Sequence, residues 1–521
     1  MNRCYTDRRA GSRTLAAITL VVAGVAVSGC VVGPNFVAPA PPQVNRYTAD
    51  GLPTQTAPVD VAGGESQRFV QGLDLPAQWW TAFESPALNA LVEQSLKANP
   101  TLLAAQASLR QAMENVRAQQ GLFYPNVQAS LSPSRQKNPV GTISPTLTSG
   151  AAVYNLYTAQ VAVSYAPDVF GANRRQVESV QAQADAQRFQ VEAAYLTLTS
   201  NVVAAAIQEA SVRAQIDATE RIVAIQRDQL GIFQRQFELG SIAMTDVVAQ
   251  EALLAQTLAA LPLLKKQLAL QRDLLTALLG RLPDQEPAER FELAALKLPQ
   301  ELPLSLPSAL VQHRPDVRAA EEQLRSASAQ IGVATANLLP QTTLTAAAGG
   351  TATSFAQMFQ AGNVFWSLAA NVAQTVFDGG TLQARRRAAV AGFDGAAAQY
   401  RATVVAAFQN VADTLRALQF DADALAAQVD AERAAARSLE YIRRGVELGS
   451  SSYLALLNAQ QAYQLAVSNL AQARANRYAD TAALFQALGG GWWNRTEAVA
   501  ATQGDTTVGA PPNRTETKTG K

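Results

Sequence analysis

The motif Glu238-Leu239-Gly240-Ser241 recurs 209 residues later as Glu447-Leu448-Gly449-Ser450. The same offset relates Gly171 to Gly380, so the interval from Gly171 to Gly240 carries no net insertion between its two copies. Nearer the N-terminus an offset of 215 relates Pro100 to Pro315. Self-similarity at a fixed offset is typical of a duplicated structural unit. The 521-residue chain therefore contains two tandem repeats of one fold.

Each repeat contains a helix far longer than a globular core requires. No proline interrupts residues 173–239, and Val223, Leu230 and Phe237 lie seven residues apart. At 1.5 Å per residue such a helix would be roughly 100 Å long, with the heptad spacing of a coiled coil. Pro262 lies within the expected return helix, where we expect it to kink or break the helix.

The recurring glycines mark the turns between these helices. Gly240 and Gly449 stand where a left-handed cap would end each long helix, and Ser241 and Ser450 follow them. The pattern predicts two antiparallel helical hairpins, one in each repeat.

Four segments alternate apolar and polar residues with the period of a β-strand. They cover residues 126–133, 155–166, 342–349 and 364–376, with Tyr157 and Trp366 at the same phase. One interpretation is a small sheet packed on a protein core. The polar faces are small and uncharged while the apolar faces carry aromatic residues, which favours a lipid-facing barrel wall. Four strands cannot close a barrel, so several copies would have to combine their strands.

The N-terminus has the order of a bacterial export signal. Arginines precede an apolar run from Leu15 to Val27, which is too short to span a membrane comfortably. Val27-Ser28-Gly29-Cys30 resembles a lipobox, after which Cys30 would be the acylated first residue; the alternative is a plain signal peptide. Val31 follows instead of the aspartate that commonly retains lipoproteins at the inner membrane, which favours outer-membrane sorting.

Composition argues against catalysis and against nucleic-acid binding. Removal of residues 1–29 would take away four arginines and one aspartate and change the formal charge from +1 to −2, which leaves no basic field for nucleic acid. His313 is the only histidine, and Cys30 would be the only cysteine left. The chain has no Ser-His-Asp signature, Cys/His metal cluster or Walker-type loop. We expect no enzymatic activity, no metal and no cofactor, with His313 at the surface or as a cap.

Two glycine motifs follow strands at corresponding positions. They are Asp168-Val169-Phe170-Gly171 and Phe377-Asp378-Gly379-Gly380. The second could be taken for a phosphate-binding turn. Its recurrence after a strand favours a strand-to-helix corner, in which glycine supplies a positive φ.

Several ordered motifs resemble the TolC-like outer-membrane factors, in particular the lipoprotein branch (NodT type) of RND-type tripartite efflux systems. They run from residue 30 to about 490 and include Cys30-Val31-Val32-Gly33-Pro34-Asn35-Phe36, Trp79-Trp80, Asn99-Pro100, Arg314-Pro315-Asp316-Val317 and Tyr453-Leu454-Ala455-Leu456-Leu457-Asn458. Each motif alone is weak, whereas the ordered set is specific.

The resemblance implies an α+β membrane protein that acts as a homotrimer. Four strands from each copy would form one 12-stranded outer-membrane barrel, continued by a helical coiled-coil barrel in the periplasm. The lipid-anchored channel would passively conduct drugs or other small molecules from a periplasmic adaptor and an RND-type inner-membrane transporter. The adaptor would contact the helix-turn tips at Gly240, Ser241, Gly449 and Ser450.

The resemblance also places a periplasmic constriction just after these turns. It maps to Leu454 and Asn458 in the second repeat and to Thr245 and Asp246 in the first. Family members usually carry aspartate where this chain has Asn458, so cation selectivity is in doubt. The alternative role for Leu454 and Asn458 is coiled-coil packing and register.

The expected organisation comprises six segments. These are a signal peptide (1–29), an anchored extended leader (30–76), a first repeat (77–282), a linker (283–306), a second repeat (307–490) and a disordered polar tail (491–521). Two other functions fit the same features: an outer-membrane duct for type I secretion, and a non-conducting lipoprotein that tethers the two membranes.

Overall fold

The computed structural model describes residues 31–137 and 153–495, which divide into two compact units. The first unit combines the segment up to Pro39 with Ala107–Arg188 and Ala319–Arg401. The second combines Ala40–Gln106, Phe189–Arg318 and the segment from Ala402 onward. The proposed signal peptide and Cys30 lie outside the described residues.

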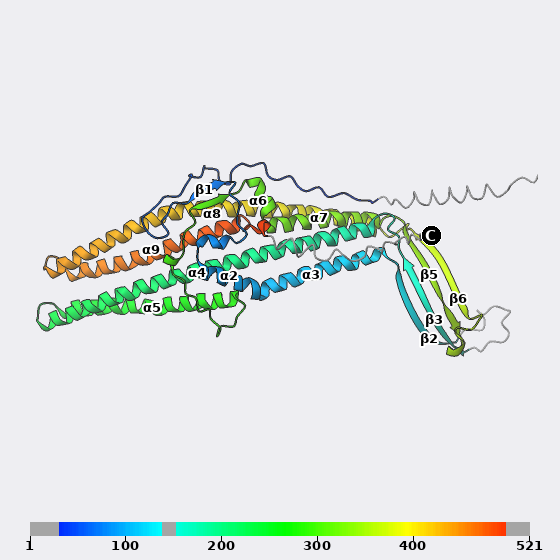
Figure 1. Cartoon of the computed structure of the whole chain (residues 1–521), viewed down its shortest axis with the longest axis horizontal. Coiled ribbons are helices and arrows are strands. Elements are labelled where there is room, and N and C mark those ends of the chain that lie inside the picture. Colours follow the sequence, from blue (N-terminus) through cyan, green and yellow to red (C-terminus); the bar gives the residue numbers. More distant parts are fainter. Residues whose placement is uncertain (1–30, 138–152, 496–521) are drawn as a thin grey trace, which may run out of the picture. The chain divides into compact units, whose positions relative to one another are not determined.

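The two repeats contain the same series of helices (Figure 1). Helices α4 and α8 have 67 residues each, and α5 and α9 have 35 residues each, as the constant sequence offset requires. Their bounds are α4 (Ala172–Glu238), α5 (Met244–Leu278), α8 (Thr381–Glu447) and α9 (Tyr453–Ala487). The shorter helices α3 (Pro100–Gln120) and α7 (Pro315–Ala336) precede the strands of each repeat.

Pro262 lies inside α5 and does not break it, which corrects that part of the expectation, whereas a kink at Pro262 stays a prediction. A proline removes a single backbone donor, and here the surrounding turns are only partly buried, so water can bind the freed carbonyl. By length and composition α5 could cross a membrane. It is not a core helix of the single chain, since only 22% of its most apolar stretch is buried.

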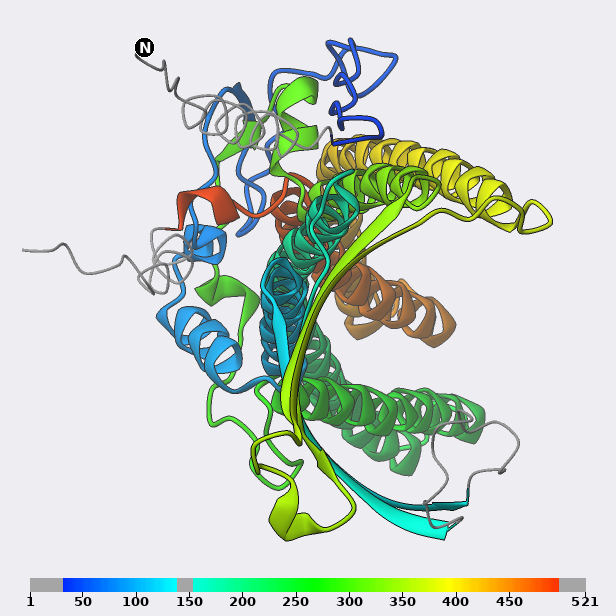
Figure 2. The same ribbon diagram turned by 90° about the vertical axis from the view of Figure 1, so that its right-hand side faces the viewer.

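Four antiparallel strands in the first unit form one curved layer in the order β2-β3-β5-β6 (Figure 2). They are β2 (Asn126–Lys137), β3 (Val153–Tyr165), β5 (Gln341–Ala352) and β6 (Val364–Ala373). All four differ slightly from the expected segments: β2 and β5 extend further, β3 starts two residues earlier and ends one residue earlier, and β6 ends before residue 376. Within the described residues, β2 and β6 each pair on one side only.

The strand register places most large apolar residues on one face of this sheet, with Leu156 and Phe365 on the other. Ala129, Val161, Ala348 and Trp366 form one row across all four strands. The adjacent row on the opposite face runs through Gln128, Ala162, Ala347 and Ser367. The side chain of Trp366 is 80% exposed, and Val127, Val161 and Leu368 are exposed with it. The alternation seen in the sequence is therefore continuous from strand to strand, and its apolar side is largely exposed in the described chain, apart from the contact of Tyr157 with the Phe355 ring.

A belt of short elements packs against the helices of the second unit. The leader supplies β1 (Arg68–Gln71), which pairs in parallel with β4 (Glu301–Leu304) from the linker. Neither strand was predicted from the sequence, because four-residue strands with a distant partner leave no periodic signal. Trp79, Trp80 and Phe83 are buried before α2 (Pro86–Ala98), and Trp79 stacks on Phe485 of α9. The belt thus joins residues from the leader, both repeats and the linker.

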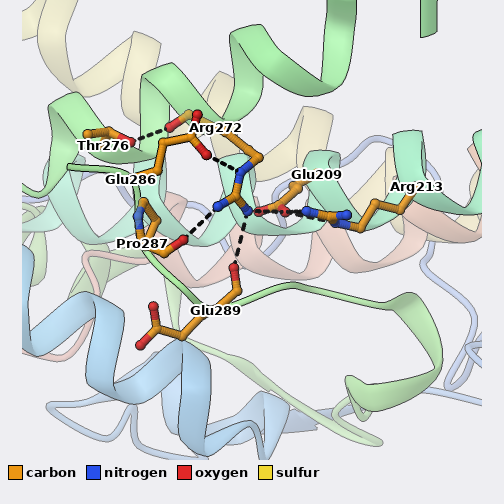
Figure 3. Close-up of polar contacts among 7 residues, drawn as sticks. All are labelled: Glu209, Arg213, Arg272, Thr276, Glu286, Pro287 and Glu289. Carbon is orange, nitrogen blue, oxygen red and sulfur yellow. Dashed lines mark hydrogen bonds and ion pairs between the residues drawn. The ribbon is translucent and has the colours of Figure 1, made fainter. Parts of the chain in front are cut away.

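Arg272 of α5 fastens the linker to the first hairpin (Figure 3). Its guanidinium donates to the carboxylates of Glu209 at 3.1 Å and Glu286 at 2.7 Å, and to the carbonyls of Pro287 and Glu289. Glu209 is fully buried and also accepts from Arg213. Because a buried carboxylate is costly without its partners, this network fixes how the linker crosses α4 and α5.

The C-terminal boundary also needs correction. Gly491–Arg495 belongs to the folded second unit instead of the disordered tail, and residues beyond 495 lie outside the described chain. Trp493 stacks on His313 with ring centroids 3.8 Å apart, and Trp492 Nε1 donates to the His313 carbonyl. His313 ends α6 (Pro307–His313), is half-buried, and has a pKa lowered by burial. It is a packing residue, not the surface or capping residue expected.

Two acidic side chains meet between α8 and α9. Burial and the hydrogen bond to the Asp421 carboxyl raise the pKa of Asp480 to about 7. An unperturbed aspartate has a pKa of about 3.9, so between about pH 4 and pH 7 the folded chain binds one more proton than the unfolded chain. Stability from this site is therefore greatest in acid and declines as the pH rises through that window.

Asp480→Asn should consequently stabilise the protein more at pH 8 than at pH 5. The full shift would correspond to about 4 kcal/mol, and we expect on the order of 1 kcal/mol because Asp480 retains some solvent contact. Thermal unfolding of the purified protein in detergent at both pH values measures the difference. Asp430→Asn, at an exposed position of α8, is the matched control. Equal changes at both pH values would contradict the assignment.

Candidate functional site

The two hairpin tips have the same turn chemistry. Gly240 and Gly449 adopt φ angles of +74° and +71°, the left-handed region expected of a helix-ending glycine. Ser241 N donates to the Gln236 carbonyl, and Ser450 N donates to the Gly445 carbonyl, each closing the last helical turn. These are Schellman-type caps, which satisfy carbonyls that the helix leaves free. Glycine is therefore required at both turns for a backbone reason.

Inside the second unit the two hairpins pack against each other near their tips. Phe233 of α4, Val247 of α5 and Leu456 of α9 form a buried cluster. The Tyr453 ring lies edge-on to Phe233 at 4.4 Å, and its hydroxyl donates to Gln236 Oε1 at 2.8 Å. Burial, with the nearby charge of Asp246, raises the pKa of Tyr453. Tyr453 therefore connects the start of α9 to the end of α4.

The residues assigned to the constriction lie next to this cluster. Leu454 is 67% exposed and Asn458, one turn later, is exposed on the same side of α9. Leu456 and Gln460 face the buried side. In the first repeat Thr245 is exposed and Asp246 is half-buried beside Tyr453. Leu454 and Asn458 thus point away from the core of their own chain, and their role in a constriction stays a prediction.

Sequence reasoning missed the two residues that join the hairpins. Tyr453 directly precedes Leu454, and Gln236 lies between the heptad positions of α4, where a polar residue is ordinary. Only the aromatic at the start of α9, seen together with Phe233, could have suggested the contact.

The strand-to-helix corners in the first unit are built by aspartate caps. Asp168 accepts hydrogen bonds from the amides of Asn173 and Arg174, and Asp378 accepts from those of Gly380, Thr381 and Leu382. Phe170 precedes Gly171 at the first corner, while Phe377 is 90% exposed at the second. Positive φ angles occur at Gly171, Gly379 and Gly380. The carboxylates satisfy helix N-terminal amides, so these motifs cap helices.

A model of the family described as "Outer membrane efflux protein" matches residues 91–281 and 306–490. The chain belongs to the outer membrane efflux protein family. The match is interrupted at the linker, between residues 281 and 306, so each repeat is matched separately.

Individual relatives agree with this membership. The pyoverdine export outer membrane protein OpmQ of Pseudomonas putida is 30% identical over 83% of this chain and 92% of its own length. The antibiotic efflux pump outer membrane protein ArpC of Pseudomonas putida is 29% identical over 93% of this chain and 97% of its own. Among solved structures, the outer-membrane channel OprN superposes with a TM-score of 0.78 at 27% identity, covering 89% of this chain and all of OprN.

Membership confirms the resemblance carried by the ordered motifs. The protein is an outer-membrane efflux channel that reaches into the periplasm, and its family consists of channels, not enzymes. The interpretation as a non-conducting tether is left without support.

Proposed function

We propose that three copies of this chain form one lipid-anchored exit channel of a tripartite efflux pump. The observation that carries the proposal is the sheet of the first unit, which has an uncovered apolar face and one unpaired edge on each of β2 and β6. Unpaired backbone groups are not tolerated in hydrocarbon, so strands from other copies must complete the sheet. Three sets of four strands give a 12-stranded barrel, an even number as in bacterial single-chain barrels.

The sparsely buried helices support the same assembly. Only 22% of the apolar stretch of α5 is covered within one chain, although it is apolar enough to favour burial. Neighbouring copies in a trimer would cover it and complete a helical barrel. A periplasmic adaptor would contact the tips at Gly240, Ser241, Gly449 and Ser450, and an RND-type inner-membrane transporter would supply energy and substrate.

The names of the relatives indicate the kind of cargo. They refer to pyoverdine export and antibiotic efflux, so we propose small organic molecules as substrates. The type I secretion alternative uses the same duct with a different inner-membrane partner. Co-purification of this channel with its adaptor and transporter distinguishes efflux from type I secretion, because it identifies the inner-membrane partner.

The barrel proposal predicts unequal effects of arginine on adjacent residues of β3. Val161 lies on the apolar face and Gln160 on the polar face. Val161→Arg should cost roughly 2–4 kcal/mol at the bilayer midplane, whereas Gln160→Arg should be tolerated in a wet lumen. The fraction of protein recovered as folded trimer from outer membranes measures this. Equal losses for both variants would refute the assignment of faces.

The gate proposal concerns Leu454 and Asn458. Three leucines would form an apolar plug and three asparagines a neutral filter at the narrowest point, because both side chains face away from their own core. In planar bilayers Leu454→Ala should raise the single-channel conductance severalfold, and Asn458→Asp should shift permeation toward cations. Leu457→Ala, on a half-buried side of α9, is the matched control for leucine removal. Unchanged conductance and selectivity in both test variants would make these residues packing elements.

Acylation of Cys30 would give the channel its anchor, because two or more acyl chains hold a protein stably on a membrane where one is marginal. We expect intact mass analysis of the purified protein to show a chain beginning at Cys30 with added acyl mass. A different N-terminus or an unmodified Cys30 would exclude the anchor.

A further inference from the structure

Arg175 occupies an unusual position in the first unit. It lies in the first turn of α4, where the helix dipole disfavours a cation, and it is nevertheless only 5% exposed. A buried arginine at a helix N-terminus requires partners outside the helix. Most of its partners come from the leader.

The guanidinium holds the first residues of the described leader. Arg175 Nε donates to the Val32 carbonyl at 3.2 Å, and Nη2 donates to the Gly33 carbonyl at 3.3 Å and to Asn35 Oδ1 at 2.7 Å. Its remaining terminal nitrogen, Nη1, binds Glu178 at 2.7 Å, which balances the charge. The planar donors of arginine suit several acceptors at once, which a lysine ammonium could not hold in the same geometry.

The backbone of the leader is fitted to the same site. Gly33 has a φ of +94°, and a Cβ there would lie 2.4 Å from Gly332 Cα on α7. A Cβ on Gly332 would in turn lie 2.8 Å from Arg175 Cγ. Two glycines thus allow leader, α7 and the arginine stem to pack in direct contact. Further along, the Arg325 guanidinium lies 5.3 Å from the centre of the Phe36 ring.

The first residues of the docked leader contact a strand-to-helix corner. Val32 N donates to the Phe170 carbonyl, and Val31 packs against the Gly171 backbone. Val31 directly follows Cys30 in the sequence, and the described leader begins at this corner. Under the proposed barrel, the corner is where β3 leaves the membrane and α4 begins.

We propose that Arg175, Gly33 and Gly332 form a docking site that holds the acylated N-terminus at the strand-to-helix corner of its own chain. The site sets the acyl chains at the same membrane boundary as the barrel strands. Arg175 acts as a positioning residue: it contacts leader carbonyls and leaves acylation itself to the signal sequence. The inference rests on the proposed lipid anchor, whereas the docking of residues 31–36 does not.

The test measures leader mobility in the full-length protein. A spin label at Val37→Cys, an 83% exposed position one residue beyond Phe36, reports whether the leader is held. We expect a restricted spectrum in the otherwise unchanged protein reconstituted in liposomes. Arg175→Met should make the mobile component the major one, and Gly332→Ala should do the same without changing charge. Arg174→Met, which removes an exposed neighbour whose partner in the described part of the chain is Asp168, should retain the restricted spectrum.

Two further measurements on the same samples decide how each spectrum is interpreted, one of folding and one of acylation. Circular dichroism and trimer content show whether a variant has folded; if Arg175→Met does not fold, Gly332→Ala decides. An unchanged spectrum in the folded variants overturns the docking site. Mass analysis of the N-terminal fragment reports acylation independently, so a held leader with an unmodified Cys30 would overturn the lipid anchor and leave the docking contacts valid.

Discussion

The structure depends on one constraint, which is that backbone N–H and C=O groups cannot be left unpaired in hydrocarbon. A single chain provides four strands, and β2 and β6 each have only one partner among the described residues. Such a sheet would be stable in a bilayer only as part of a closed barrel, which is why we propose that several copies form one channel. In the proposed barrel, lipid would cover the apolar face that is largely exposed in the single chain.

Closure also explains why insertions are excluded from the helical parts of the repeats. If copies assemble side by side, every helix of one repeat has to remain in register with neighbours contributed by other copies. Both pairs of helices accordingly have identical lengths, 67 and 35 residues. The offset between the repeats changes from 215 to 209 between Pro125 and Gly171, where the strand connection can change length without shifting a packed helix.

Periodicity in the sequence predicted the elements that repeat locally. The long helices, the phase of all four strands and the positive φ of Gly240 and Gly449 follow from residue spacing and backbone chemistry within a few positions. The β1–β4 pairing could not be predicted, because it joins residues more than two hundred positions apart through backbone groups that any sequence possesses. The contact of Tyr453 with Gln236 and the stacking of His313 on Trp493 likewise depend on which side chains the fold brings together. The expected break at Pro262 was wrong for the opposite reason. The loss of one backbone donor at a proline is a local effect, and α5 continues past Pro262 because the surrounding turns are only partly buried.

The duplicated halves keep the same backbone and differ in their contacts. Asp168 and Asp378 cap α4 and α8 alike, and both hairpins end in the same glycine turn. At the 209-residue offset, however, Arg175 corresponds to Ala384, and Tyr453 corresponds to Met244. The arginine that holds residues 32–35 of the leader therefore comes from the first repeat, and the tyrosine that contacts the other hairpin comes from the second. The two copies thus share one backbone geometry, and differences at single positions give each copy its own contacts, one with the leader at a strand-to-helix corner and one at the hairpin tips.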